Sequence, residues 1–498
     1  MNIMMLLEMA NSVFPDRIAF TNAEDKSSIT FQELFDKSGQ AASAAQNSGS
    51  EYFAVLDVTS LAMPIGLFGS AWAGLPFVPI NYRLTKEEIE QLVSRITPAY
   101  LVTEDKRVGE LSEIDNLKVS SRNQFLCDVI PSFSQAEPWS MDPDDVAVLL
   151  FTSGTTGEPK AAVLRQKHMV SYILGSVEFA SAGEEEAALV CAPPYHVAGI
   201  TAVLSSVYSG RRVVQLPNFS AEAWIELARS ERITMAFVVP TMLARIVEAL
   251  DGFSSADMPH LASLSFGGGK MPLPVLEKAM QLFPNTDFTN AYGLTETSST
   301  VSVLGPDEHR EAAASDDDYV KHRLASVGIP LPGIEIEIRS DDGVALGSDE
   351  SGEIYVRGEQ VSGEYRGIGR LTDDDGWFPT KDKGYIDRNG YLYLEGRADD
   401  VIVRGGENMS PGEIEDVLVL HEAVADVAVV GIPDEQWGEG IAALVVLHAG
   451  KEVTDDELKL WVKDRLRSSR VPQIINYTDA LPYTATGKLL RRQVKIEL

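Results

Sequence analysis

Cysteine is scarce in this 498-residue chain, and its two cysteines form no recognisable pattern. Cys127 and Cys191 lie far apart, outside the Cys-x-x-Cys spacing of structural zinc sites, and two residues cannot build a disulfide framework. We therefore expect a protein of a reducing, cytoplasmic compartment. No basic residue precedes Arg17, and Glu8 interrupts the first apolar segment, so the N-terminus lacks the pattern of a secretory signal peptide.

Basic residues are also few: 42 Lys and Arg stand against 74 Asp and Glu, and the formal net charge is −32. Such a surface repels nucleic-acid phosphates at long range, so nucleic acid is not an expected partner. An anionic substrate must instead meet a local positive patch. The simplest role for the acidic surface is solubility.

Long uninterrupted apolar runs are missing as well. Two stretches, 58–82 and 187–210, contain no Asp, Glu, Lys or Arg, but proline and glycine break both of them. Buried α/β elements explain these breaks better than a spanning helix does, so we expect no transmembrane segment.

Short apolar runs alternate with helical patterns through the first part of the chain. Expected strands are Tyr52–Val58, Ala99–Thr103, Val146–Phe151, Arg212–Gln215 and Met235–Val239. Expected helices are Met4–Val13, Lys86–Ser94, Ala221–Ser230 and Pro240–Leu250. This alternation predicts parallel sheets covered by helices.

The pattern changes from Val327 onward. Short strands with Gly/Asp turns predict an antiparallel barrel or sheet: Ile334–Arg339, Gly352–Arg357, Gly384–Asp387 and Tyr391–Glu395. A small α+β module follows, with a helix start at Ser410, where Pro411 takes the first position and Glu413 closes a capping box. Its strand Val424–Ile432 and helix Asp455–Ser468 come next. The predicted fold is α/β, with two helix-covered sheets and a barrel-like β subdomain in residues 1–398, then a small mobile domain in residues 399–498.

A loop rich in glycine and hydroxyl groups follows the expected strand Val146–Phe151. It consists of Thr152, Ser153, Gly154, Thr155, Thr156, Gly157, Glu158, Pro159 and Lys160. The glycines allow close backbone approach to an anion, the hydroxyls donate to phosphate oxygens, and Lys160 adds a positive charge. Because the Walker A order is absent, this predicts a phosphate loop of another kind.

Further motifs follow in a fixed order. They are Pro194-Tyr195-His196, Gly267-Gly268-Gly269, Asn290-Ala291-Tyr292-Gly293-Leu294-Thr295-Glu296-Thr297, Gly352-Glu353-Ile354, Trp377-Phe378-Pro379-Thr380-Lys381-Asp382, Gly396-Arg397-Ala398-Asp399-Asp400, Gly405-Gly406-Glu407-Asn408 and Thr484-Ala485-Thr486-Gly487-Lys488. With the phosphate loop, this series resembles the superfamily of adenylate-forming enzymes: acyl-CoA synthetases, luciferases and peptide-synthetase adenylation domains. The resemblance spans nearly the whole chain and implies activation of a carboxylic acid with ATP, followed by transfer to a thiol.

The resemblance implies an ATP site with defined roles. Glu296 would hold Mg²⁺ and Thr295 would donate to the α-phosphate. Tyr292 would stack on adenine, Asn290 would bond its amine, and the backbone at Gly267, Gly268, Gly269 and Gly293 would border the ring.

Asp382 and Arg397 would bind the ribose, since a carboxylate accepts bonds from both ribose hydroxyls. Lys381 stands where the family usually has glycine, so the shape of this loop is the open point.

The catalytic charge would come from Lys488, since a lysine point charge suits the oxygens of a pentavalent phosphorus transition state. Asp399 matches the family's hinge. The resemblance implies a second domain pose in which Gly405, Gly406 and Glu407 line a channel for the thiol of coenzyme A. Such a swap lets one site carry out two half-reactions.

The acyl pocket is expected at His196, Val197, Val239 and Phe266. No fixed acid there would bind an amino group, so we expect a fatty, branched, alicyclic or aromatic acid that is uncharged apart from its reacting carboxylate. Lys270, where the family usually has a small residue, is expected to point outward.

The acceptor thiol is open between coenzyme A and a carrier protein. The chain ends soon after Lys488, so we expect no fused carrier domain, and coenzyme A is favoured; loading of a separate phosphopantetheine carrier protein is the alternative. Oxidation of the adenylate, as in luciferases, and a non-enzymatic scaffold are further readings, and intact Lys160, Glu296, Asp382 and Lys488 argue against the scaffold. A homodimer is also open.

Overall fold

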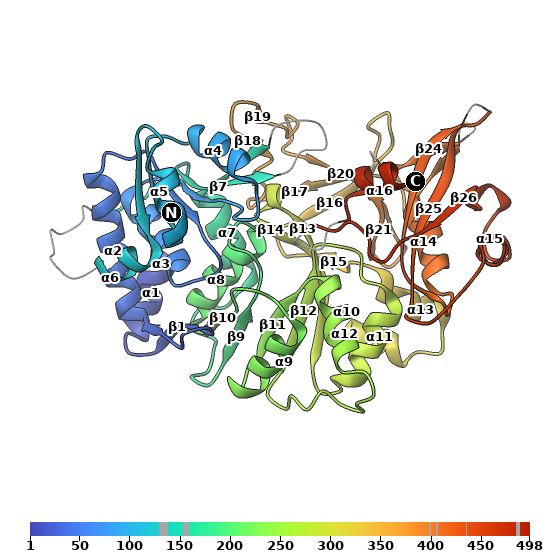
Figure 1. The fold of residues 1–498 in the computed structure, drawn as a ribbon, viewed down its shortest axis with the longest axis horizontal. Helices are drawn as coiled ribbons and strands as arrows, with labels where there is room; N and C mark the ends of the chain where they lie inside the picture. The colour runs from blue at the N-terminus through green and yellow to red at the C-terminus, as the bar shows by residue number, and fades with distance from the viewer. Residues whose placement is uncertain (129–137, 153–158, 398–399, 405–406, 435, 485–488) are drawn as a thin grey trace.

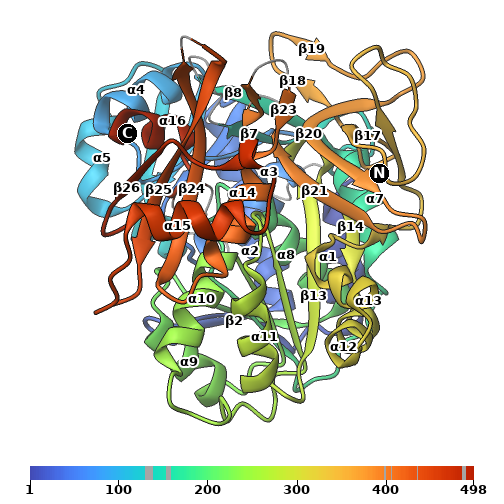
Figure 2. The same cartoon turned by 90° about the vertical axis from the view of Figure 1, so that its right-hand side faces the viewer.

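The computed structural model describes residues 1–498 except 129–137, 153–158, 398–399, 405–406, 435 and 485–488. Two large sheets and their helices form the N-terminal part, and the C-terminal module, coloured red, stands at one end of it (Figure 1). Figure 2 views this end of the molecule with the module in front.

A nine-stranded sheet runs in the order β15-β14-β13-β12-β11-β9-β10-β1-β2. Its strands are β1 (Ile18–Asn22), β2 (Ser28–Thr30), β9 (Ala187–Val190), β10 (Arg212–Gln215), β11 (Met235–Val238), β12 (Ser263–Gly267), β13 (Asp287–Leu294), β14 (Ser299–Leu304) and β15 (Ile329–Pro330). The six central strands from β13 to β1 pair in parallel, and β2, β14 and β15 are antiparallel at the edges. Parallel strands end at one edge of a sheet, where ligand sites of α/β proteins form.

An eight-stranded sheet runs in the order β19-β18-β8-β7-β4-β3-β5-β6. Its strands are β3 (Tyr52–Leu56), β4 (Phe77–Pro79), β5 (Ala99–Thr103), β6 (Leu117–Ser121), β7 (Val146–Thr152), β8 (Lys160–Arg165), β18 (Glu364–Tyr365) and β19 (Gly369–Arg370). β7 and β8 form an antiparallel hairpin, and the distant segment β18 joins its outer edge.

Thirteen described helices belong to the N-terminal part. They are α1 (Met4–Val13), α2 (Phe31–Asn47), α3 (Ala62–Ala73), α4 (Lys86–Ser94), α5 (Asp105–Leu111), α6 (Arg122–Asp128), α7 (Gln166–Ser176), α8 (Val197–Ser209), α9 (Ala221–Ser230), α10 (Pro240–Ala249), α11 (Leu273–Leu282), α12 (Pro306–Ala314) and α13 (Asp318–His322). Short 3₁₀ turns η1 (Thr295–Thr297) and η2 (Arg323–Ala325) complete them. Local capping fixes several starts: Thr30 and Thr85 each close a capping box, with Glu33 and Glu88.

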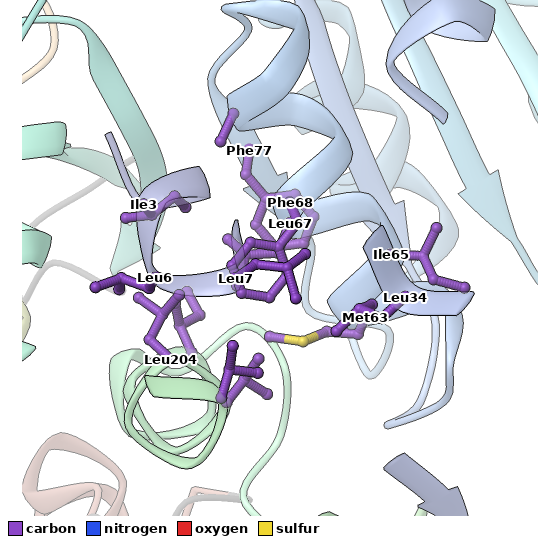
Figure 3. Packing of buried hydrophobic residues seen from close by; sticks show 14 of the residues in the cluster. Ile3, Leu6, Leu7, Leu34, Met63, Ile65, Leu67, Phe68, Phe77 and Leu204 are labelled. Carbon is purple, nitrogen blue, oxygen red and sulfur yellow. The ribbon is translucent and has the colours of Figure 1, made fainter. Parts of the chain in front are cut away.

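The two sheets share one layer of helices. Leu6 and Leu7 of α1 are fully buried between Phe68 of α3 on one side and Leu204 of α8 on the other (Figure 3). α9 to α11 cover the opposite face of the nine-stranded sheet, and α4 covers that of the eight-stranded sheet. Helices therefore cover both faces of both sheets, as the alternating pattern predicts.

The expected small β subdomain is a four-stranded antiparallel sheet in the order β16-β17-β20-β21. Its strands are β16 (Glu335–Arg339), β17 (Gly352–Arg357), β20 (Phe378–Ile386) and β21 (Leu392–Arg397). The predicted strand Gly384–Asp387 is the end of the longer β20. Tyr292 and Val301 of the nine-stranded sheet pack into its apolar side.

The C-terminal module has a sheet of β22 (Ile402–Arg404), β23 (Glu407–Met409), β24 (Val424–Asp434), β25 (Gly438–Leu447) and β26 (Ile474–Tyr477). Its helices are α14 (Pro411–Val419), α15 (Asp455–Lys463), the turn η4 (Ser468–Arg470) and α16 (Arg491–Glu497). Separate apolar clusters fill the two faces of the sheet. The module therefore has its own core.

Two local predictions for this module are wrong. Ser410 precedes α14, with Pro411 in the first turn, but its side chain makes no cap bond. Its hydroxyl donates to the Glu395 carbonyl instead, and Glu413 pairs with Arg470 at 3.0 Å, so no capping box forms. The helix expected to reach Ser468 ends at Lys463. Across the part of the chain that the structure describes, no helix is long and apolar enough to cross a membrane.

Candidate active site

Close backbone contact between β12 and β13 defines one wall of the site. A Cβ at Gly267 would lie 2.2 Å from the Ala291 carbonyl oxygen, and one at Gly293 would lie 1.8 Å from that of Ser299. Only glycine fits either position. Gly268 has φ +81°, a conformation that favours glycine. A Cβ added at Gly268 would lie 3.7 Å from the Val239 side chain, which borders this space. Bare backbone of this kind lets a flat ring approach closely.

A polar cluster joins this wall to the small antiparallel sheet. The Tyr292 hydroxyl donates to Asp382 Oδ2 at 2.7 Å, and Arg397 Nε lies 2.9 Å from Asp382 Oδ1. Arg397 also donates to the Thr380 carbonyl at 3.0 Å. Burial raises the pKa of Tyr292 well above its usual value, and the negative charge of Asp382 adds to this, so the phenol stays a donor. Tyr292, Asp382 and Arg397, to which the resemblance assigns contacts with adenine and ribose, are therefore in direct contact with one another.

Asn290 is buried on β13, and its side-chain amide donates to the Ser326 carbonyl at 2.9 Å. This bond uses the donor side of the amide. An adenine amine needs the acceptor side, so the orientation suits the expected role, which stays a prediction. Stacking of Tyr292 on adenine also stays a prediction. The Tyr292 ring packs in the apolar cluster of the small sheet.

Lys381 adopts the left-handed conformation, with φ +61°, immediately before Asp382. The position is not in a loop: it lies inside β20, where the pairing with β17 skips the residues between Pro379 and Lys383. The family usually has glycine here, and a non-glycine residue in this conformation costs roughly 1–2 kcal/mol. Asp382, the next residue, is buried.

Glu296 lies in η1, and its carboxylate accepts a hydrogen bond from the Tyr365 hydroxyl. The Glu296 carbonyl accepts from the backbone of Ser362 at 2.8 Å and Gly363 at 3.1 Å. Tyr365 itself pairs with Ala162 of β8 in the phosphate-loop hairpin. The hairpin and the expected metal carboxylate are therefore linked through Tyr365.

The phosphate loop itself, from Ser153 through Gly154, Thr155, Thr156 and Gly157, lies outside the described residues. Its base is described: Thr152 pairs with Lys160 across the hairpin, and the Thr152 hydroxyl donates to the Lys160 carbonyl at 3.4 Å. Lys160 is exposed at the start of β8. β8 of this hairpin packs against η1, the turn that carries Glu296.

A magnesium ion that arrives with ATP needs few protein ligands, because phosphates and water fill most of its octahedron. One carboxylate, Glu296, suits this arrangement. Among the residues the structure describes, no group of three or more His, Cys, Asp or Glu side chains is placed to hold a resident metal. The donor set therefore fits an ion shared with the nucleotide.

The acyl pocket stays a prediction, and the structure describes the residues expected to line it. His196 is half-buried at the N-cap of α8, followed by buried Val197, and Gly199 has no room for a side chain because a Cβ would lie 2.7 Å from the Pro193 carbonyl. Phe266 differs from expectation. It is fully buried with Leu264 in the helix-side core and packs edge-on against His309 at 5.8 Å, so it does not line an open pocket. Thr295 is half-buried in η1.

Lys270 points away from the acyl side, as expected. Its Nζ lies 2.5 Å from Asp416 Oδ2 on α14, which connects the glycine-rich turn to the C-terminal module.

The residues expected for hinge, channel and catalysis fall largely outside the described set: Asp399, Gly405, Gly406 and Lys488. Glu407 is described only by its backbone, which pairs with Arg404 in the β22–β23 hairpin. The residues on either side of the motif at 484–488 are described: Tyr483 and Leu489 form a β-bridge.

Arg491 follows that bridge and is a residue that sequence reasoning did not single out. It donates to both oxygens of Glu415 at 2.6 and 2.9 Å and to the Val429 carbonyl at 2.6 Å. Its Nε lies 3.4 Å from Asp400, beside the expected hinge. Arg491, three residues after Lys488, is therefore bonded to Asp400, the residue after the expected hinge Asp399.

Two family models match the chain. The model described as AMP-binding enzyme matches residues 7–366, and that described as AMP-binding enzyme C-terminal domain matches residues 413–488. Among curated relatives, a 2-succinylbenzoate–CoA ligase of Bacillus cereus (strain ZK / E33L) is 30% identical over 487 residues, covering 97% of this chain and 95% of the relative. One of Bacillus licheniformis is 30% identical over 495 residues, covering 98% of each.

Solved structures agree with these matches. O-succinylbenzoate CoA synthetase (MenE) from Bacillus subtilis with its acyl-adenylate intermediate superposes with a TM-score of 0.84 at 30% identity, covering 98% of this chain and 97% of that one. The same enzyme with ATP and magnesium ion gives a TM-score of 0.83 at 29% identity, with 98% and 99% covered. ATP-bound MatB from Rhodopseudomonas palustris, at 23% identity and a TM-score of 0.87 over 100% and 99%, shows the shared fold.

Proposed function

The chain belongs to the AMP-binding enzyme family, and from that premise we propose that it is an ATP-dependent acid–CoA ligase. It activates a carboxylic acid as the acyl-adenylate with release of pyrophosphate, and then transfers the acyl group to the thiol of coenzyme A. The observation that carries this is the meeting of distant motifs: Glu296 accepts from Tyr365, whose strand pairs with the phosphate-loop hairpin, and Tyr292 and Arg397 meet at Asp382.

These residues suit the adenylation half-reaction, in which a carboxylate oxygen attacks the α-phosphorus and pyrophosphate leaves. Two anions must meet, so the site has to neutralise charge and align the groups. The phosphate loop with Lys160 would hold the β- and γ-phosphates, and Asp382 and Arg397 would hold the ribose. Magnesium supplies charge neutralisation at the phosphate oxygens when bound beside Glu296.

Lys488 is assigned to the transition state and coenzyme A to the second step by resemblance. Pyrophosphate release should require Lys488: Lys488→Ala should lower it at least a hundredfold, whereas Lys495→Ala, an exposed lysine of the last helix, should not change it. Thioester formation from chemically prepared acyl-adenylate should survive Lys488→Ala. A Lys488→Ala variant with the full adenylation rate would refute the assignment.

The second half-reaction distinguishes the two candidate acceptors, coenzyme A and a carrier protein. Each would be supplied as acceptor after pyrophosphate release is established across a panel of acids. Thioester formation with free coenzyme A supports the proposed ligase. Transfer only to carrier proteins bearing phosphopantetheine would instead establish the carrier-loading alternative.

The acid is proposed to carry one carboxylate only. The elements around the expected pocket present no Lys or Arg within α8, β11, β12, η1 or β14. Lys270, which follows β12, pairs with Asp416. A second carboxylate buried against these elements would find no cation among their side chains, and an unpaired buried charge is costly. A fatty-acid pathway in particular is not supported by the curated relatives above, which are named for 2-succinylbenzoate.

A matched pair of acids tests this directly. 2-Succinylbenzoate carries two carboxylates, and 4-oxo-4-phenylbutanoate is the same skeleton without the carboxylate on the ring. We expect this chain to prefer the monocarboxylate in kcat/KM by at least tenfold. A preference for 2-succinylbenzoate would refute the single-carboxylate proposal and leave the acid–CoA ligase activity in place.

A further inference from the structure

The segment 362–366 crosses from the small sheet to the phosphate-loop hairpin, and it is fixed on that hairpin at several points. Tyr365 pairs with Ala162, and the Arg366 backbone donates to the Ala161 carbonyl at 2.9 Å. The neighbouring Glu364 receives a two-pronged hydrogen bond from Arg165 at 2.9 and 2.7 Å. The backbone that carries Tyr365 is therefore fixed on β8.

From this fixed position the half-buried Tyr365 side chain points toward the nucleotide side. Its hydroxyl donates to Glu296 Oε1. The Glu296 carbonyl is held by the backbone amides of Ser362 and Gly363, which belong to the same segment. Main-chain bonds thus locate the residue, and Tyr365 fixes the remaining freedom, which is the orientation of the carboxylate.

We propose that Tyr365 is a positioning residue for Mg–ATP: its hydroxyl occupies one oxygen of Glu296 so that the other faces the metal. This rests on the proposed function, because it takes Glu296 as the metal ligand. A glutamate with free side-chain torsions must be ordered each time it binds an ion, whereas a carboxylate held by a hydrogen bond is ordered in advance.

Phenylalanine has the same ring and removes only the bond to Glu296, so Tyr365→Phe separates positioning from packing.

The test is the binding of ATP by the full chain, measured by calorimetry with EDTA and again with Mn²⁺, together with the electron paramagnetic resonance spectrum of enzyme-bound Mn–ATP. The gain in affinity is the ratio of the ATP affinity with Mn²⁺ to the ATP affinity with EDTA. We expect Tyr365→Phe to lower this ratio about tenfold and to leave the affinity in EDTA unchanged. We also expect the variant to broaden the Mn²⁺ spectrum. In a Glu296→Gln background, Tyr365→Phe should add nothing further.

Tyr319→Phe is the matched control, since Tyr319 also donates to a carboxylate, Asp387, at 2.8 Å, but away from the site; it should leave both affinities unchanged. An unaltered metal-dependent gain in Tyr365→Phe would overturn the proposal. So would an equal loss with and without metal, because that marks a structural role. The assay needs neither acid nor coenzyme A, so a wild-type chain that binds Mn–ATP and forms no thioester would count against the proposed function alone.

Discussion

Arg491 should be the main stabilising polar residue of the C-terminal module, and its removal gives a prediction with a definite magnitude. Its side chain is 19% exposed and that of its partner Glu415 is 14% exposed. Burial alone would lower the arginine's pKa, but the nearby charge of Glu415 raises it overall, so the pair is ionised. Arg491→Gln would leave Glu415 buried with the Val429 amide, at 2.7 Å, as its described partner.

Removing one member of a buried ion pair costs about 3–5 kcal/mol, because the other charge is left without compensation. Replacing both charges costs far less. Arg491→Met combined with Glu415→Gln keeps an acceptor for the Val429 amide and leaves no buried charge, so it should restore most of the lost stability.

Hydrogen exchange measured by mass spectrometry reports this module separately from the rest of the chain. Because 1.4 kcal/mol is a factor of ten, amides of β24 and β25 should exchange about a hundred to several thousand times faster in Arg491→Gln. Strands of the nine-stranded sheet should not change.

Arg470→Gln is the control. Arg470 pairs with Glu413, which is 42% exposed, so water can take over and the effect should be within about 1 kcal/mol. Unchanged exchange of β24 in Arg491→Gln, or a double variant no more stable than the single one, would refute the assignment of a buried, compensated pair.

Three further predictions follow from single positions. Lys381→Gly should stabilise the chain by up to about 1 kcal/mol in urea unfolding, since relief of the left-handed strain exceeds the entropy cost of glycine; a destabilised variant would argue against strain. Gly267→Ala should weaken ATP binding more than tenfold in calorimetry, because its Cβ would lie 2.2 Å from the Ala291 carbonyl, whereas Gly175→Ala, with open space around it, should not. His168 has a pKa lowered to about 4, mainly by burial, so the unfolded chain binds its proton first as the pH falls from 6.5. About 2 kcal/mol of unfolding free energy should be lost between pH 7 and pH 5 through this group, and His168→Gln should flatten that part of the urea-unfolding profile.

The parallel sheets were predictable because a buried strand has a local signature. Ala99–Thr103 and Arg212–Gln215 have the predicted bounds, since their apolar runs end at charged or turn residues. The capping box at Ser410 failed for the opposite reason. Its local pattern is correct, but Glu395 and Arg470, distant in sequence, offered stronger partners.

The site was predictable where a motif is contiguous. Tyr292, Asp382 and Arg397 meet as the resemblance implies. Tyr365 carries no such signal, because its strand has only two residues and pairs with a hairpin far back in the chain. Phe266 was misplaced because its neighbour Gly267 borders the site, whereas strand alternation turns Phe266 itself toward the helices.

The two arginine contacts at the domain junction also set the length of a tether. Arg397 is bonded to Asp382 on the N-terminal side, and Asp400 is bonded to Arg491 on the C-terminal side. Three peptide steps join Arg397 to Asp400, which limits the distance between their Cα atoms to about 11 Å. If the module turns at Asp399, as the resemblance implies, so short a tether would let it turn but not drift away, and any group that it presents would return to the site at a high effective concentration. Lengthening this junction with flexible residues should therefore slow both half-reactions without touching a single side chain of the nucleotide site.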